Sequence, residues 1–400
     1  MVSRHLAASS SVWLSPARIL LGLTGLLSVL GLFFVFESSL AEAFALVGDQ
    51  YHFVKLQAGY LILGWGALVV AFLTPFRVWQ KAAPLLYGFG LLLMVMVFIP
   101  GFGREINGAH RWLFIGPFRG QPIEFVKLAV TLFFASWMIK HQRLLPFLFL
   151  TGIPILLAML QPDLGSCLIL TAIAFSLYFV AGGKIKPFAA LSVVSIALLT
   201  LLIITSPYRL QRLQTFFNPE LDPLGSSFHI RQITLALGSG GWFGQGIGNS
   251  RQKFSYIPEA STDSIFAIVA EEVGFIGSIS IIALFLLYIW CAYRIIKQTH
   301  QGAYAQMVGM GILIWISSQV ILNLSAVVAL VPLTGVPLPF ISYGGSSLVT
   351  LFIIVGLVRN VEKNQKLLYL KSDLNQTKKD GNHHRNSLDS GHRAHSSIEK

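Results

Sequence analysis

One carboxylate in the sequence stands where acid–base chemistry could occur at a membrane surface. Asp263 begins an apolar run after a long polar segment, and Arg251, Lys253 and Glu259 lie shortly before it. A carboxylate placed between charged groups and an apolar environment can be tuned as a general base. At the start of a helix, the same residue can instead be a cap that the helix dipole favours. Asp263 is therefore the candidate catalytic residue, and the three charged residues before it are candidates for substrate binding.

Other ionisable residues lie at the edges of apolar segments or within them, where charge is costly unless it has a role. Glu124 and Lys127 are three residues apart, a spacing that places both on one face of a helix. They form either a structural ion pair or a site in which Lys127 faces a substrate phosphate and Glu124 positions it. Asp163 is either the N-cap of the following helix or a polar site residue.

Two stretches rich in glycine or proline also carry polar side chains. Residues 238–249 contain many glycines but lack the Lys-Ser/Thr ending of a nucleotide-binding loop, so no nucleotide is expected. Residues 334–347 combine prolines with adjacent glycines, which favours non-helical backbone. At membrane depth such backbone must be buried in protein or line a wet cavity. Ser342 and Tyr343 are therefore expected to line a polar cleft.

The elements that must position these residues are helices in a lipid bilayer. Of the 400 residues, 54% are hydrophobic and 12% are charged, with a mean hydropathy of +0.69; a soluble domain carries about a quarter charged residues. A membrane-spanning helix needs about 20 apolar residues. The sequence predicts an all-α polytopic membrane protein with ten transmembrane helices, over residues 19–36, 53–74, 82–100, 124–139, 144–160, 166–182, 187–206, 264–293, 306–331 and 346–358.

The distribution of Lys and Arg predicts the orientation. With the N-terminus in the cytoplasm, every inner connection carries at least two basic residues, as the positive-inside rule requires. The net charge of +12 therefore indicates membrane topology rather than nucleic-acid binding. We expect a cytoplasmic segment at residues 1–18, the helical membrane domain at 19–366, a large outer loop between the seventh and eighth helices at 207–262, and a disordered cytoplasmic tail at 367–400.

The outer segments, residues 101–123 and 207–262, are also basic, against the usual bias. These residues are either solvated and paired with nearby acids, or they bind an anionic headgroup such as a pyrophosphate, whose oxygens suit bidentate arginine contacts. The outer basic residues are Arg104, Arg111, Arg119, Arg209, Arg212, Arg231, Arg251 and Lys253.

Six motifs in order resemble those of the SEDS (shape, elongation, division and sporulation) family. They begin at Asn107 (NGAHRW), Gln121 (QPIEFVK), Gln161 (QPDLG), Asp222 (DPLG) and Thr262 (TDSIFA), and end with PFISYGGSS at residues 339–347. The resemblance covers residues 15–362. Within the family, residues 248–254 resemble the cell-division branch, FtsW, more than the elongation branch, RodA.

The resemblance implies a peptidoglycan glycosyltransferase that joins lipid II units on the outer face of the cytoplasmic (inner) membrane, at the division septum, and releases undecaprenyl pyrophosphate. It implies that Asp263 is the essential carboxylate, as general base or as ligand of an assisting divalent cation (Mg²⁺ or Mn²⁺). It also directs attention to Arg111, Trp112, Glu124, Lys127 and Asp163. Expected partners are lipid II and the nascent glycan strand, a class B penicillin-binding transpeptidase, and other division proteins.

Two other functions are compatible with parts of the sequence. A lipid II flippase would also suit a buried Glu124–Lys127 pair and broken backbone near residue 339. The charged residues, however, cluster on the outer face rather than at the midplane, and the inner loops are short. A structural scaffold for a division complex explains neither Asp263 nor the outer arginines.

Overall fold

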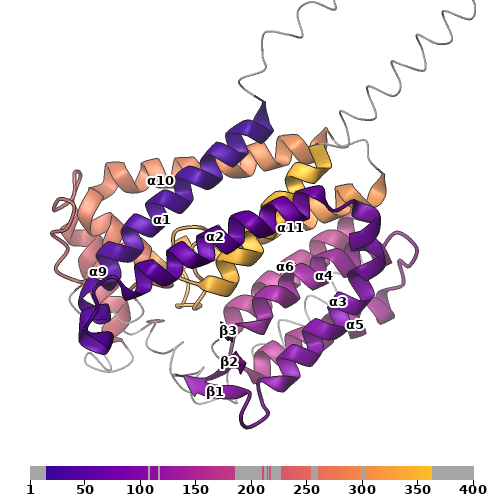
Figure 1. Ribbon diagram of the computed structural model, residues 1–400, viewed down its shortest axis with the longest axis horizontal. Helices are drawn as coiled ribbons and strands as arrows, with labels where there is room; N and C mark the ends of the chain where they lie inside the picture. The colour runs from indigo at the N-terminus through magenta and orange to yellow at the C-terminus, as the bar shows by residue number, and fades with distance from the viewer. Residues whose placement is uncertain are drawn as a thin grey trace, which may run out of the picture.

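The computed structural model describes residues 15–106, 109–115, 118–184, 210, 214, 216–217, 227–253, 260–298 and 302–362. The described chain consists of helices and one small sheet (Figure 1). The helices are α1 (Pro16–Val47), α2 (His52–Leu73), α3 (Phe76–Met96), α4 (Pro122–Trp137), α5 (Leu144–Leu160), α6 (Leu164–Val180), α9 (Phe228–Ser239), α10 (Ile265–Lys297), α11 (Ala303–Val327) and a last helix, Gly345–Glu362.

The helices confirm a polytopic membrane protein. Each predicted apolar segment coincides with a helix, except residues 187–206, which lie outside the described residues. Within the described part of the chain, six helices are long and apolar enough to cross a bilayer: α1, α2, α3, α10, α11 and the last helix. Helices α5 and α6 are apolar but have 17 residues each, and α4 has 16.

Proline and glycine determine where α1 begins and ends, and a glycine breaks α10. Helix α1 starts at Pro16, because the fixed φ of proline suits the first helical turn, and stops at Gly48, whose φ of 74° forms a left-handed C-cap. Helix α10 is broken at Gly274, with φ 67° and ψ −167°, a conformation almost restricted to glycine. The part of α10 before this break, from Ile265 to Glu272, is entirely buried.

A three-stranded antiparallel sheet lies between α3 and α4. Strands β1 (Gly103–Ile106), β2 (Ala109–Ile115) and β3 (Phe118–Gly120) pair in the order β1-β2-β3. In β2, Ala109 and Leu113 are buried, and Arg111 lies between them in sequence. The sheet runs directly into α4, which it contacts through β2.

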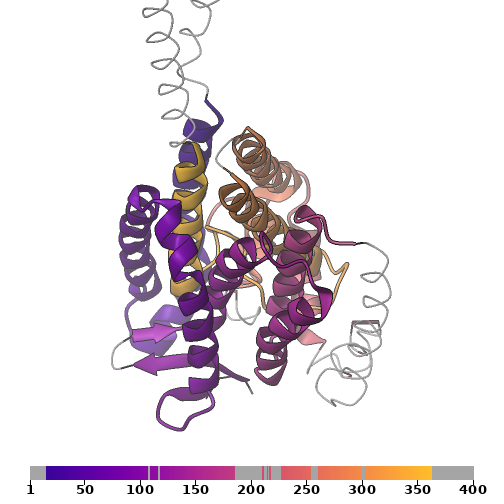
Figure 2. The same ribbon diagram turned by 90° about the vertical axis from the view of Figure 1, so that its right-hand side faces the viewer.

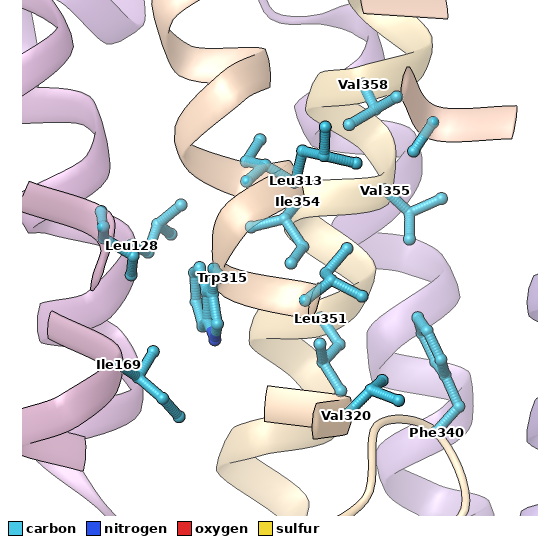
Figure 3. Close-up of a cluster of buried hydrophobic side chains, with 14 of the residues drawn as sticks. Leu128, Ile169, Leu313, Trp315, Val320, Phe340, Leu351, Ile354, Val355 and Val358 are labelled. Carbon is cyan, nitrogen blue, oxygen red and sulfur yellow. The ribbon is translucent and has the colours of Figure 1, made fainter. Parts of the chain in front are cut away.

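The helices pack around α10, α11 and the last helix. Helix α1 lies along α10, while α4 and α6 pack against each other and against α11. Figure 3 shows Trp315 on the side of α11 that faces Leu128 of α4 and Ile169 of α6, with Leu351, Val355 and Val358 of the last helix on the other side. The start of α1 and the end of the last helix lie at one end of the bundle, away from the sheet (Figures 1 and 2).

Candidate functional site

Asp263 is held at the point where three helices meet. It lies directly before α10, and Ser264, not Asp263, occupies the N-cap position. The Ser264 hydroxyl donates to Asp263 Oδ1 at 3.3 Å and lies 2.8 Å from Nε2 of His229 on α9. The amide of Asn323 on α11 donates to the backbone carbonyl of Asp263 at 2.8 Å. The result is a half-buried carboxylate in a fixed backbone setting, rather than a helix cap.

The segment between α11 and the last helix, residues 328–344, approaches Asp263 from the other side. It is non-helical, as predicted, and its Tyr343 N–H donates to the Ser261 carbonyl at 2.8 Å. Gln57 of α2 donates to the Ser342 carbonyl at 3.3 Å and accepts from the Gly344 N–H at 3.4 Å. The predicted site residues Tyr343 and Asp263 are thereby brought to one place.

Ser342 and Tyr343 have different environments within this segment. The Ser342 hydroxyl is buried and accepts a hydrogen bond from Leu338 N–H at 2.8 Å, so it stabilises the segment itself. Tyr343 is half-buried, and its ring meets Phe53 edge to face. Burial raises the pKa of the Tyr343 phenol to about 12, so this group remains a hydrogen-bond donor at neutral pH.

Helix α11 carries a polar stripe with a spacing of four residues, which places its members on one helical face. Trp315 Nε1 donates to Gln319 Oε1 at 2.9 Å, and Gln319 Nε2 donates to the Pro337 carbonyl at 2.9 Å. One turn on, Asn323 donates to the carbonyls of Val336 and Asp263, both at 2.8 Å. This stripe connects the segment after α11 to Asp263.

Glu124 and Lys127 form a buried ion pair on α4. Lys127 Nζ lies 2.7 Å from Glu124 Oε1, and the two side chains are 1% and 3% exposed, respectively. The Lys127 ammonium also lies 5.5 Å from the centre of the Trp315 ring, at the far end of the α11 stripe. Glu124 Oε2 is buried and has no hydrogen-bond partner in the part of the chain that the structure describes.

Arg111 and Asp163 meet at the turn between α5 and α6. Arg111 Nε donates to the Gln161 carbonyl at 3.0 Å, and its Nη2 donates to the Pro162 carbonyl. Asp163 is the N-cap of α6 and accepts from Ser166 N–H at 3.0 Å, as one of its two interpretations predicted. Trp112, the neighbour of Arg111 in β2, pairs with Arg104 of β1 and is half-buried.

The same turn contacts the segment that reaches Asp263. A Cβ added to Gly165 would lie 2.3 Å from a Val336 side-chain atom and 2.6 Å from the Thr334 carbonyl, so the start of α6 and that segment touch closely. Gly335 lies beside the Arg111 guanidinium. Strand β2 is thus linked to the surroundings of Asp263 through residues 334–336.

Lys253 and Arg251 lie in the chain before α10, next to Glu271 and Glu272 at the break in that helix. Lys253 Nζ contacts Glu37 Oε2 of α1 at 2.9 Å, the Gly248 carbonyl at 2.6 Å and Glu272 Oε1 at 3.4 Å. Lys253 is therefore a buried bridge between α1 and α10, whereas the Arg251 side chain is exposed. Glu259 lies outside the described residues.

The glycine-rich stretch is a tight loop against the break in α10. Gln245 and Gly246 donate to the carbonyls of Glu271 and Glu272 at 2.9 and 3.1 Å. The Glu271 carboxylate accepts from Ser250 Oγ at 2.5 Å and from the Arg251 and Gln252 amides at 3.1 and 3.4 Å. These two acidic residues therefore face protein partners rather than lipid.

The donor set near Asp263 fits a cation only in part. Among the described residues, no three His, Cys, Asp or Glu side chains lie close enough to form a metal site. Magnesium, however, is often held by one or two carboxylates together with substrate phosphates. The half-buried Asp263 carboxylate could supply that single protein ligand.

Several residues of this site escaped the sequence analysis. Ser264 contacts Asp263 directly, and His229 contacts it through Ser264. Asn323 holds the backbone of Asp263, and Gln319 holds the segment after α11. A polar pair four residues apart inside an apolar helix is a detectable signal, since buried polar groups in membrane helices need partners. For His229 the sequence offers no such signal.

Comparison with known proteins identifies the family. Residues 17–367 match the FtsW/RodA/SpoVE family, described as "Cell cycle protein". The chain belongs to this family. Two curated relatives are each 38% identical to it. The match to a "Probable peptidoglycan glycosyltransferase FtsW" of Thioalkalivibrio sulfidiphilus covers 86% of this chain and 90% of the relative. The match to the "Stage V sporulation protein E" of Bacillus subtilis covers 87% of this chain and 97% of the relative.

Solved structures of the family share the fold. A chain from a peptidoglycan synthase complex, studied for how polymerization and crosslinking are coordinated, superposes with a TM-score of 0.70 at 28% identity. The match covers 86% of this chain and 97% of that one. The rod shape determining protein RodA of Thermus thermophilus gives a TM-score of 0.63 at 27% identity, covering 86% and 96%.

Proposed function

We propose that this protein is a peptidoglycan glycosyltransferase of the FtsW/RodA/SpoVE family that polymerises lipid II during cell division. The observation that carries the proposal is Asp263, a half-buried carboxylate held by α9, α10 and α11. Family members that match 86–87% of this chain at 36–38% identity bear the name of this activity. A sporulation protein is equally similar, so division is the branch that the most relatives' names support.

In the proposed reaction, Asp263 acts as the general base. It removes the proton from the 4-hydroxyl of the acceptor sugar while that oxygen attacks the anomeric carbon of the donor. The bond between that carbon and the pyrophosphate oxygen breaks, and undecaprenyl pyrophosphate leaves with the electron pair. One oxygen of Asp263 is fixed by Ser264, which limits rotation of the carboxylate.

Developing charge on the pyrophosphate requires nearby cations. Arg111 is the proposed contact from the sheet, with Trp112 beside it, Asp163 shaping the turn below and Tyr343 as a neutral donor. A divalent cation, where present, would be held by Asp263 and the substrate and would supply positive charge to the leaving group. Lys127 is neutralised by Glu124, which favours a structural role for that pair.

The proposed topology has ten transmembrane helices with both termini in the cytoplasm and the large loop of residues 207–262 outside. The common position of the start of α1 and the end of the last helix supports an even number of crossings (Figure 1). The similarity to a chain of a peptidoglycan synthase complex supports a class B penicillin-binding transpeptidase as partner. Residence at the division septum, with other division proteins, follows from the branch assignment.

The test is polymerisation of purified lipid II in liposomes, with the cognate transpeptidase, by the wild type and by Asp263→Asn. The substitution keeps the shape of the side chain and removes the base. The matched control is Asp49→Asn in the exposed α1–α2 connection. There a hydrogen bond from Lys55 holds the pKa of Asp49 below its usual range, so Asp49→Asn removes a negative charge at neutral pH.

Long glycan strands from the wild type and Asp49→Asn, and none from folded Asp263→Asn, are the expected result. Equal polymerisation by all three proteins would move the catalytic base elsewhere. If none polymerises while the wild type moves labelled lipid II across the bilayer, the protein is a flippase and the proposal is wrong.

A further inference from the structure

Ser264 is the N-cap residue of α10, but its hydroxyl does not cap the helix. Serine at an N-cap normally accepts a hydrogen bond from a backbone amide of the first helical turn. Ser264 makes no such side-chain cap; only its backbone carbonyl accepts from Ala267 N–H, at 2.9 Å. Its side chain is fully buried, and its hydroxyl contacts His229 and Asp263 instead.

The direction of this hydrogen-bond chain follows from the number of protons. A serine hydroxyl carries one hydrogen, and when it donates to Asp263 Oδ1 it has only acceptor capacity left for His229. Nε2 of His229, 2.8 Å away, must then carry a hydrogen and donate it. The chain therefore runs from the imidazole N–H through the hydroxyl to the carboxylate.

The chain joins two elements that are separate in sequence. His229 is the second residue of α9, a helix that packs against α10 and α11, while Ser264 and Asp263 belong to the start of α10. Helix α9 thus fixes the position of the His229 imidazole, and the buried Ser264 hydroxyl links this ring to the Asp263 carboxylate. Asn323 fixes the backbone of Asp263, and the Ser264 hydroxyl limits rotation of its carboxylate.

We propose that His229 and Ser264 are positioning residues that orient the Asp263 carboxylate for catalysis. This inference rests on the proposed role of Asp263 as the base. Misplacement of a reacting group by about 1 Å can lower a rate about 100-fold. Loss of the chain should therefore lower kcat about 10- to 100-fold and leave KM for lipid II within about 2-fold.

The experiment measures kcat and KM for lipid II polymerisation, per folded protein, in Ser264→Ala, Ser264→Thr, His229→Leu and His229→Gln. Threonine keeps the hydroxyl, and glutamine keeps an N–H donor, so both should retain more than a third of the wild-type kcat. The double variant Ser264→Ala/His229→Leu should be no slower than Ser264→Ala alone, because either substitution already breaks the same series of hydrogen bonds. Ser280→Ala removes a hydroxyl from the exposed surface of the same helix and is the matched control, with unchanged kcat.

A purely structural contact between α9 and α10 predicts a different pattern. Melting temperatures would fall, kcat per folded molecule would stay at the wild-type value, and threonine and glutamine would rescue stability rather than rate. That outcome overturns the inference, as would additive losses in the double variant. If Asp263→Asn itself remains active, the proposed role of Asp263 as the base fails first; if it is inactive while Ser264→Ala has wild-type kcat, only the positioning role is wrong.

Discussion

The buried Glu124–Lys127 pair allows a sharp test of how the membrane domain is stabilised. The Lys127→Met substitution removes one charge from a pair with side chains 1% and 3% exposed. It leaves Glu124 with two buried oxygens, of which Oε2 already has no partner in the described chain. Breaking such a pair costs about 3–5 kcal/mol, because the remaining charge is uncompensated. We expect Lys127→Met to lose that much stability.

The double variant Glu124→Gln/Lys127→Met removes both charges and should recover at least half of the loss. The free energy of unfolding would be measured in detergent by titration with a denaturing detergent. The control is Lys55→Met, which breaks a pair of the same 2.7 Å length at the surface, with side chains 67% and 38% exposed. Exposed pairs contribute about 0–1 kcal/mol, so this variant should change little.

Two results would refute this reasoning. One is a Lys127→Met protein within about 1 kcal/mol of the wild type, which would mean that burial does not set the energy of the pair. The other is a double variant as unstable as the sum of the single ones. Polymerisation by the double variant then separates the two interpretations of the pair, since a stable but inactive protein would assign Lys127 to the substrate.

Two further predictions concern backbone held in unusual positions. Gly274→Ala should destabilise the protein by more than about 2 kcal/mol in the same unfolding measurement, because Gly274 has a conformation almost restricted to glycine and the new Cβ would lie 2.2 Å from a backbone nitrogen of the glycine-rich loop. The control Gly59→Ala, in open space on α2, should be neutral, and equal effects of the two variants would contradict the argument. Asn323→Leu leaves the Asp263 and Val336 carbonyls without this donor, at about 1–3 kcal/mol each, and should also reduce lipid II polymerisation; unchanged stability and rate would show that the α11 stripe does not hold the site.

The sequence by itself determined the class of the protein and most of its helices. Apolar runs of about 20 residues have one stable solution in a bilayer, since the backbone must satisfy its own hydrogen bonds. The prolines and glycines of residues 334–347 predicted non-helical backbone there, which is correct for residues 334–344, whereas the last helix already begins at Gly345. The N-cap interpretation of Asp163 also follows from local rules, because a cap depends on residues only three positions away.

The tertiary structure decided which polar residues meet. His229 and Ser264 are 35 positions apart and Gln57 and Ser342 are 285 apart, and only packing of the helices brings each pair together. The ion pair between Lys253 and Glu37 spans 216 positions. It holds Lys253 beside the break in α10, whereas the sequence placed this residue among the candidates for substrate binding. A sequence pattern reports periodicity along one helix, whereas these contacts depend on how helices are rotated against each other. That rotation is fixed by complementary side-chain shapes throughout the interior, such as Gly165 against Val336, which no local pattern encodes.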